Sequence, residues 1–459
     1  MKETRPFSMK DKIGYTLGDL GCCCTEQFRA MYLAIFYTLV LKVNPVHVGI
    51  LMLITKFWDA INDPLIGALV DSHKNKGKGK FIPWIKFFAF PTAVLCILGF
   101  VNVSNFAYGA RIAYMFITYI VYEIMYTCVS VPFGSLSSVM TDDVNQRTDL
   151  SRFRSLGGTI FMTVIVIAGP LFLYKDNQPV PSHFLIMSAI CAVIGLICLM
   201  FTSHWCKERI ITEPVDEKKE KLNYFQVIKD ITKNKALLGV MLSSFIGIVG
   251  AGMVNGLNTY LFRDYFGNVA IMAVSGMLSV IWSLIAFVGT KFVAKKFGKK
   301  EWIMYSATFS VVVYAILFFF PLENPMLFII INGICYLGVS GFQVLVWALV
   351  NDAIDYQELQ TGKRNEGIVY SAYTFFRKLA NAVSGSMSSF ALAIAGFQVN
   401  EAVQNEAFSG RLWKTYTGLY VVGYLLAVLV LKFIYPLTKE KTAEMLQDLA
   451  DKRNAATAE

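Results

Sequence analysis

Residues 184–201 read FLIMSAICAVIGLICLMF, an apolar stretch of 18 residues without one charged side chain. A helix needs about 20 predominantly apolar residues to cross the hydrocarbon core of a bilayer. Runs of similar character occupy Phe87–Val101 and Tyr416–Leu431. Only 16% of the 459 residues are charged, against about 25% in soluble domains. The pattern predicts a protein that crosses a membrane many times.

The net charge of +10 lies in clusters of the kind that orient a membrane protein. Basic residues gather at both ends of the chain and in alternate loops, at Lys2–Lys12, Lys74–Lys86, Lys207–Lys235, Lys291–Lys300 and Lys432–Lys441. Because cytoplasmic loops carry the excess of Lys and Arg, both termini are expected on the cytoplasmic side of a bacterial inner membrane. Membrane orientation accounts for the charge, so no nucleic-acid partner is expected.

Apolar runs predict twelve helices in two sets of six. The first set covers residues 12–40, 46–70, 83–103, 109–139, 153–175 and 183–206, and the second covers 236–263, 268–292, 301–320, 325–351, 366–397 and 411–436. The charged segment 207–235 is interpreted as a cytoplasmic linker between bundles 1–206 and 236–437, and 438–459 as a cytoplasmic tail. Two six-helix bundles in this arrangement are typical of major facilitator transporters. We expect an all-α polytopic membrane protein with that fold, and a monomer.

An ionisable side chain inside a membrane helix is costly, so each one marks a candidate functional residue. Lys56, Asp59 and Asp63 share one face of the second helix, with Asn62 one step aside. Two carboxylates one turn apart repel each other when both are ionised. Either one of them is protonated, or a monovalent cation lies between them. The alternative is a structural salt bridge at the cytoplasmic end of the helix.

The fourth helix places Glu123, Tyr126 and Ser130 on one face. A carboxylate, a phenol and a hydroxyl together suit the hydroxyl groups of a sugar, and the ring of Tyr126 offers an apolar face to a pyranose. The alternative is a polar seam between helices.

The eleventh helix aligns Thr374 and Lys378 at a spacing of four residues, with Arg377 adjacent. Two neighbouring cations this far into a helix would bind an anionic group of a substrate or neutralise the acids of the second and fourth helices. Alternatively, their long side chains reach the membrane surface.

Charged residues also lie in the first helix and at the start of the fifth. Glu26 and Arg29 are three residues apart, so they either neutralise each other or take part in substrate binding. Asp19 shares the face of Glu26. Arg147 and Arg154 stand at the cytoplasmic entrance of the fifth helix, where surface anchoring is the default and an inward-reaching arginine is the alternative.

Several motifs resemble those of the glycoside–pentoside–hexuronide:cation symporters, a family of melibiose permease-like major facilitators. They are Tyr15–Asp19, Trp58–Pro64, Gly79–Trp84, Tyr126–Leu136, Asn351–Tyr356, Gly367–Tyr370 and Phe376–Lys378. The resemblance runs in register from Lys12 to Leu437. It implies a secondary transporter that carries a sugar or glycoside together with Na⁺ or H⁺ by alternating access. The implied cavity is central, with helices 1, 2, 4 and 5 facing helices 7, 8, 10 and 11.

The resemblance also implies roles for particular residues. Positions that bind the cation in the melibiose permeases carry oxygen-bearing side chains here, namely Asp59, Asn62, Asp63 and Thr127. Positions that bind the sugar or lie near it match Tyr126, Arg154 and Lys378. A site of this kind performs no covalent chemistry, so no enzyme activity and no cofactor are expected beyond the co-transported ion.

Departures from the melibiose permeases concern the sugar. Two aspartates and two tryptophans of their sugar sites are replaced here by Cys23, Ser130, Gly134 and Gln343. Glu26 and Glu123 would restore carboxylate contacts, and Arg377 stands beside Lys378. This combination favours a glucuronide, another β-glycoside or a xyloside over an α-galactoside. A related carrier of a lipid or other amphiphile is the alternative.

Cytoplasmic charges are expected to form an inner gate. Asp71, Lys74, Arg147 and Arg154 would make ion pairs that break and reform during the transport cycle. A membrane-embedded enzyme or sensor would instead need a metal cluster, a nucleophile–base pair or a large soluble domain. The nine cysteines and four histidines show no CxxC or HExxH spacing, and the sequence gives no sign of the other two.

Overall fold

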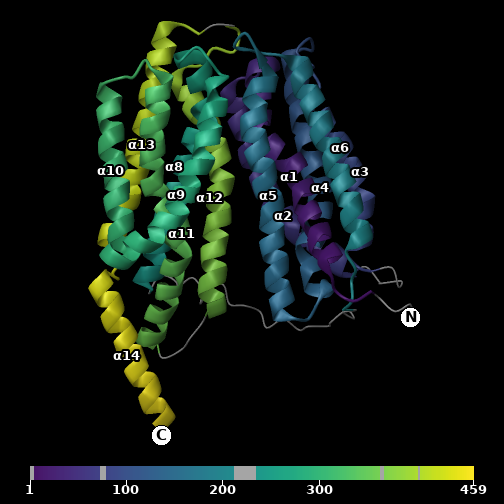
Figure 1. Cartoon of the computed structure of the whole chain (residues 1–459). Coiled ribbons are helices and arrows are strands. Elements are labelled where there is room, and N and C mark those ends of the chain that lie inside the picture. Colours follow the sequence, from purple (N-terminus) through teal and green to yellow (C-terminus); the bar gives the residue numbers. More distant parts are fainter. Residues whose placement is uncertain (1–4, 73–78, 211–233, 362–365, 402–403, 459) are drawn as a thin grey trace. The chain divides into compact units, whose positions relative to one another are not determined.

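The computed structural model describes residues 5–72, 79–210, 234–361, 366–401 and 404–458, and these ranges are almost entirely helical (Figure 1). The chain divides into two compact units, Met1–Lys218 with Gln398–Ala402, and Lys219–Phe397 with Val403–Glu459. Each unit has its own core of packed apolar side chains.

The first unit consists of six long helices and one short hairpin in its described residues. The helices are α1 (Met9–Ile35), α2 (Pro45–Ser72), α3 (Ile82–Leu98), α4 (Tyr108–Met140), α5 (Val144–Leu173) and α6 (Pro181–Trp205). Strands β1 (Tyr174–Lys175) and β2 (Gln178–Pro179) pair antiparallel between α5 and α6. The turn residues Asp176 and Asn177 have φ of 51° and 61°. Asp and Asn tolerate this left-handed backbone, which explains the tight turn.

The second unit contains six long helices and a C-terminal helix in its described residues. They are α8 (Lys235–Tyr260), α9 (Ile271–Phe297), α10 (Lys299–Phe319), α11 (Pro325–Thr361), α12 (Glu366–Ala395), α13 (Glu406–Phe433) and α14 (Lys439–Ala458). Helix α8 packs along α12 and α13, while α10 packs against α11 and α13. Met445 and Leu449 attach the otherwise polar α14 to the core of this unit.

Every helix expected from the sequence corresponds to a helix in the structure, with two notable differences in length. Helix α5 begins at Val144 instead of residue 153, because Asp143 caps it and accepts hydrogen bonds from the backbone N–H of Asn145 (2.7 Å) and Gln146 (3.3 Å). Helix α11 continues to Thr361, ten residues beyond the expected end. Both extensions are polar, and the sequence expectation followed only the apolar part of each helix.

The first helices of the two units end in the same way, which is a structural trace of an internal repeat. Helix α1 runs into the π-helical turn η1 (Phe36–Val40), and α8 runs into η2 (Leu261–Tyr265). The residue after each turn donates its backbone N–H to the first residue of the turn, at 3.0 Å and 3.1 Å. Lys42 and Gly267 then both have positive φ, 56° and 68°. Each position in the second unit lies 225 residues after its counterpart (267 against 42), as expected for parallel repeats.

The repeat does not extend to the charged residues. Helices α1 and α2 carry acids and bases deep in their sequences, whereas residues 236–260 of α8 and 271–290 of α9 contain no Asp, Glu, Lys or Arg. The first two helices of the first unit therefore differ in chemistry, though not in backbone, from their counterparts.

Much of the exterior is apolar. Seven described helices are long and apolar enough to cross a membrane by length and composition alone, namely α4, α5, α6, α8 with η2, α9, α10 and α13. Large side chains such as Leu284 (63% exposed) and Phe309 (51% exposed) point outward from them. Helices α1, α2 and α12 carry more polar residues, and they hold most of the candidate site.

Candidate functional site

The two acids of α2, Asp59 and Asp63, have different hydrogen-bond partners. Lys56 Nζ lies 3.0 Å from Asp59 Oδ2, so the salt bridge considered from the sequence is present. The other oxygen, Asp59 Oδ1, is buried and has no hydrogen-bond partner among the described residues. Its lone pairs remain available for a proton or a cation. Asn62, one step aside, is 4% exposed, and its Nδ2 also lacks a hydrogen-bond partner within the part of the chain that the structure describes.

Helix α4 brings the expected threonine to the other acid. Thr127 Oγ1 donates a hydrogen bond to Asp63 Oδ1 at 3.3 Å, joining α4 to α2. The four residues expected to bind a cation thus come from two packed helices. Hard monovalent cations prefer such oxygen ligands. The part of the chain that the structure describes has no group of three or more His, Cys, Asp or Glu placed to hold a metal ion.

Arg29 connects the first and fourth helices. Its Nη1 lies 3.4 Å from Glu123 Oε1 and 3.9 Å from Glu26 Oε2, so the mutual neutralisation considered from the sequence involves a third residue. Arg29 and Glu123 are almost completely buried, while Glu26 is 23% exposed. The guanidinium carbon also lies 3.3 Å from the ring centroid of Tyr122, a cation–π contact. Position alone does not reveal this triad, since Glu123 is 94 residues from Arg29.

Tyr126 continues the same stack of aromatic groups. Its ring is nearly parallel to that of Tyr122, with an angle of 8° and 5.8 Å between centroids. Tyr126 and Ser130 are half-buried one turn apart, and Gly134 follows on the same side as an exposed residue. A Cβ added at Gly134 would meet no atom within 4 Å. The expected polar strip on α4 therefore ends in open space.

Asp19 is held by the fifth helix. Arg154 Nε donates to Asp19 Oδ1 at 3.0 Å, and the backbone N–H of Gly158 donates to Oδ2 at 2.9 Å. Cys23 Sγ lies 3.9 Å from the same carboxylate. This close approach requires glycine, because a Cβ on Gly157 would lie 2.5 Å from a backbone oxygen of α1. Arg154 is thus paired with Asp19 while its side chain is 44% exposed, and a role in substrate binding stays a prediction.

In the second unit, the described residues offer no carboxylate to the cations of α12. Arg377 is half-buried over the indole of Trp347 (5.5 Å to the ring centroid), and Lys378 is exposed. No described carboxylate forms an ion pair with either. On the same helix Thr374 is half-buried, and on α11 Gln343 is exposed. Whether Arg377 and Lys378 neutralise the acids of the second and fourth helices stays a prediction.

The expected gate is only partly within the described residues. Lys74 and the side chain of Asp71 lie outside them. The side chain of Arg147 donates hydrogen bonds to the backbone oxygens of Thr141 (2.8 Å) and Ser138 (3.2 Å). It thereby caps the C-terminal end of α4. Surface anchoring thus describes Arg147 here, and a gating role stays a prediction.

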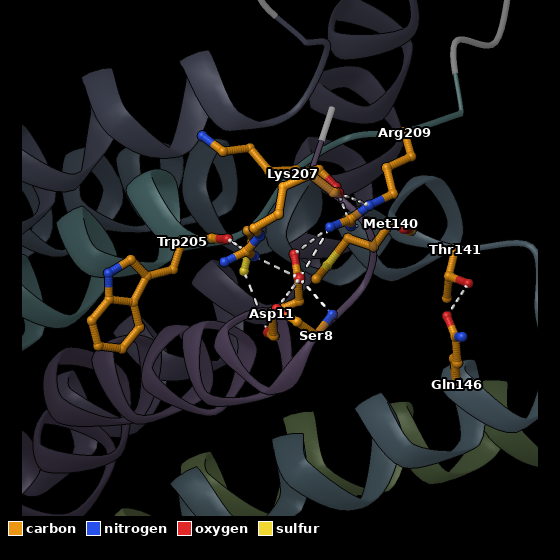
Figure 2. A network of polar contacts seen from close by, with 10 residues as sticks. Ser8, Asp11, Met140, Thr141, Gln146, Trp205, Lys207 and Arg209 are labelled. Atoms are coloured by element: carbon orange, nitrogen blue, oxygen red, sulfur yellow. Dashed lines mark hydrogen bonds and ion pairs between the residues drawn. The ribbon is translucent and has the colours of Figure 1, made fainter. Parts of the chain in front are cut away.

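A polar network at the end of the first unit was not expected from the sequence (Figure 2). Asp11 is fully buried and pairs with Arg5 (2.7 Å) and Arg209 (3.0 Å). The adjacent Glu208 accepts hydrogen bonds from the first backbone N–H groups at the start of α3, at 2.6–2.8 Å. Residues that looked like the beginning of a linker therefore fasten α1, α3, α4 and α6 together. In the sequence, only the alternation of basic and acidic residues at 207–209 could have indicated these contacts, and that pattern is common in solvent-exposed segments.

The fold is that of solved transporters. A bacterial homologue of the human lysosomal transporter Spinster, in an inward-facing and unoccupied conformation, superposes with a TM-score of 0.67. The alignment covers 97% of this chain and 99% of that one, at 11% sequence identity. The chain is thus an all-helical, multi-span membrane protein with the major facilitator fold.

A family model described as "MFS/sugar transport protein" matches residues 14–439, so the chain belongs to this family. It is 32% identical to an uncharacterised symporter, YjmB, of Bacillus subtilis (97% of this chain, 96% of the relative). It is 28% identical to a putative sulfoquinovose importer of Salmonella typhimurium (98% and 94%) and to an isoprimeverose transporter of Lactiplantibacillus pentosus (98% and 93%). The resemblance to cation symporters of glycosides is confirmed, and the chain is a transporter of sugars or glycosides and not an enzyme.

Proposed function

We propose that this chain is a cation-coupled symporter of an acidic glycoside, of which a glucuronide is the model, working by alternating access. The observation that carries the proposal is the Arg377–Lys378 pair, two adjacent cations in the interior of α12 that form no ion pair with a carboxylate of the described residues. Such charges are costly in a membrane unless a partner or water compensates them. A carboxylate or sulfonate on the substrate supplies the missing partner.

The similarity to these relatives does not determine the substrate class. Sulfoquinovose is a sulfonated sugar and isoprimeverose a neutral xyloside. Unpaired cations favour the acidic class, because a charge-assisted hydrogen bond is about twice as strong as a neutral one.

The coupling ion is assigned to the first unit. Asp59 and Asp63, with Thr127, would hold one Na⁺ or one proton between α2 and α4. Binding of the ion removes negative charge from the helix pair, and by linkage substrate and ion raise each other's affinity by the same factor. The distribution of basic residues supports an inner-membrane protein with both termini on the cytoplasmic side.

The test compares two glycosides that differ only at one group. Uptake of methyl β-D-glucuronide and methyl β-D-glucoside would be measured in right-side-out vesicles. Wild type is expected to prefer the glucuronide, and Lys378→Gln should lower that preference about tenfold or more. Lys414→Gln, which removes an exposed lysine of α13, is the matched control. Equal uptake of both glycosides by wild type, or an unchanged preference in Lys378→Gln, would contradict recognition of the acid group.

A further inference from the structure

Helix α12 of the second unit presents polar groups on one exposed side. Helix α12 exposes Phe375, Lys378, Asn381 and Gly385 at spacings of three or four residues, so they share one side of the helix. By contrast, α9 exposes Leu284 and neighbouring aliphatic side chains. We call Phe375, Lys378, Asn381 and Gly385 the α12 strip.

An exposed amide or ammonium group indicates a water-facing or ligand-binding surface more strongly than an exposed hydroxyl does. On α5, the exposed Ser155 and Thr159 donate to the carbonyl oxygens four residues earlier, at 3.1 Å and 2.8 Å. A hydroxyl satisfied in this way tolerates lipid. Lys378 and Asn381 have more hydrogen-bonding groups than their own helix can satisfy. The α12 strip therefore faces water or a polar ligand and not hydrocarbon.

Helix α8 adds an amide beside the strip. The two helices run side by side in Figure 1 and touch through small residues, because a Cβ on Gly252 would overlap Ser384 and one on Gly256 would overlap Ser388. In this register the exposed Asn255 lies level with residue 387 of α12. That is nine residues beyond Lys378, or about 14 Å along the helix. The distance is longer than one pyranose ring.

The amide of Asn255 is oriented by residues behind it. Tyr416, which is 1% exposed, donates its hydroxyl to Asn258 Oδ1 at 2.8 Å. Asn258 Nδ2 in turn donates to Asn255 Oδ1 at 3.3 Å. These hydrogen bonds use Oδ1 of Asn255 as an acceptor, so the NH₂ group of this exposed residue is the part of the amide left to donate. On α12, Asn381 Nδ2 donates to the backbone oxygen of Arg377 at 3.1 Å, which leaves Asn381 Oδ1 as an acceptor.

We propose that Asn255 and Asn381 bind hydroxyl groups of the glycoside whose acid group is held by Lys378. The inference rests on the proposed function and extends its site from α12 to α8. A sugar hydroxyl donates and accepts, so it fits the acceptor of Asn381 and the donor of Asn255. The exposed ring of Phe375 (63%) lies at the other end of the α12 strip. Because the surface exceeds one ring in length, it suits a glycoside with a second sugar or an aglycone.

A reporter cysteine tests whether the strip binds the glycoside. Gly385→Cys places a thiol on the strip where an added Cβ meets nothing within 4 Å, so the polar groups stay intact. Labelling would be compared with that of the wild-type protein, in which Cys23 is half-buried and the other eight cysteines are buried. Labelling by a charged thiosulfonate would be followed in permeabilised vesicles. Leu284→Cys, on the apolar face of α9, is the matched control.

We expect rapid labelling of Gly385→Cys, slow labelling of Leu284→Cys, and protection of Gly385→Cys by methyl β-D-glucuronide. At ten times its Kd the glycoside should slow labelling about tenfold by mass action. Adding Asn255→Ala or Asn381→Ala should raise the glycoside concentration needed for protection about fivefold each. Asn145→Ala, which removes an exposed amide at the start of α5, should leave it unchanged.

Two results would overturn the inference while leaving the proposed function intact. One is glucuronide uptake by the Gly385→Cys protein with labelling as slow as at Leu284→Cys, or as fast with glycoside as without it. The other is protection that neither asparagine substitution weakens. Absence of glucuronide uptake by wild type would instead refute the proposed function, on which the inference depends.

Discussion

Arg29 is expected to contribute more to stability than either acid that it contacts. Its side chain is 3% exposed and pairs with Glu123 and Glu26. Breaking a buried ion pair by removing one partner costs about 3–5 kcal/mol, because the other charge is left uncompensated. Arg29→Met leaves two carboxylates without their cation and removes the contact with Tyr122, so we expect a loss of about 5 kcal/mol. Glu123→Gln leaves Arg29 near Glu26, so we expect about 2 kcal/mol.

The double variant separates an ion pair from simple packing. Arg29→Met with Glu123→Gln should lose less stability than Arg29→Met alone, because the buried carboxylate that Arg29 compensated is gone. The free energy of unfolding would be measured by titrating detergent-solubilised protein with SDS and following tryptophan fluorescence. Arg152→Met, at an exposed arginine of α5, should stay within about 0.5 kcal/mol of wild type. The reasoning is refuted if Arg29→Met costs less than 1 kcal/mol, or if the double variant loses the sum of both single losses.

Three further predictions concern separate contacts. Thr127→Val removes the hydrogen bond to Asp63 and should raise the cation concentration for half-maximal uptake several-fold. Thr118→Val, which removes hydrogen bonds to the backbone oxygens of Tyr114 and Met115 in the same helix, should not. Equal values for both variants would exclude Thr127 as a ligand. Gly157→Ala should separate α1 from α5 and lower the yield of monodisperse protein in size-exclusion chromatography, while Gly134→Ala should not; a normal profile for Gly157→Ala would show that the helices yield. Glu208→Gln should weaken the cap of α3 by about 1 kcal/mol, seen as faster hydrogen exchange at residues 80–82, and unchanged exchange would contradict it.

Much of the fold could be predicted because membrane insertion imposes a simple rule. A spanning segment must satisfy its backbone internally and present apolar side chains, so run length and composition locate helices. The ends of the helices were harder to predict from the sequence. Helix α5 starts nine residues early because of the cap at Asp143, and the end of α11 is polar. Beyond the apolar core, local capping and packing decide where a helix ends, and hydropathy does not record them.

The site was predictable where its residues lie on one helix. Helical spacing placed Lys56 beside Asp59, and the contact is present. Contacts between helices needed the structure or the family resemblance. The pairing of Arg29 with Glu123 and of Asp19 with Arg154 depends on which helices pack and how closely. Asn255 could not be predicted as a site residue, because a single asparagine in an apolar run has no distinctive spacing. Its exposure on a membrane helix makes it a candidate for substrate binding.

The most direct test of the account measures gradient-driven uptake of labelled methyl β-D-glucuronide into vesicles. Wild type, Asp59→Cys and Asp63→Cys would each be given an inward Na⁺ gradient, an inward proton gradient or neither. The account predicts accumulation by wild type with one of the two gradients and none with either variant. Accumulation that needs no gradient, or normal accumulation by both variants, would contradict cation coupling through the acids of α2.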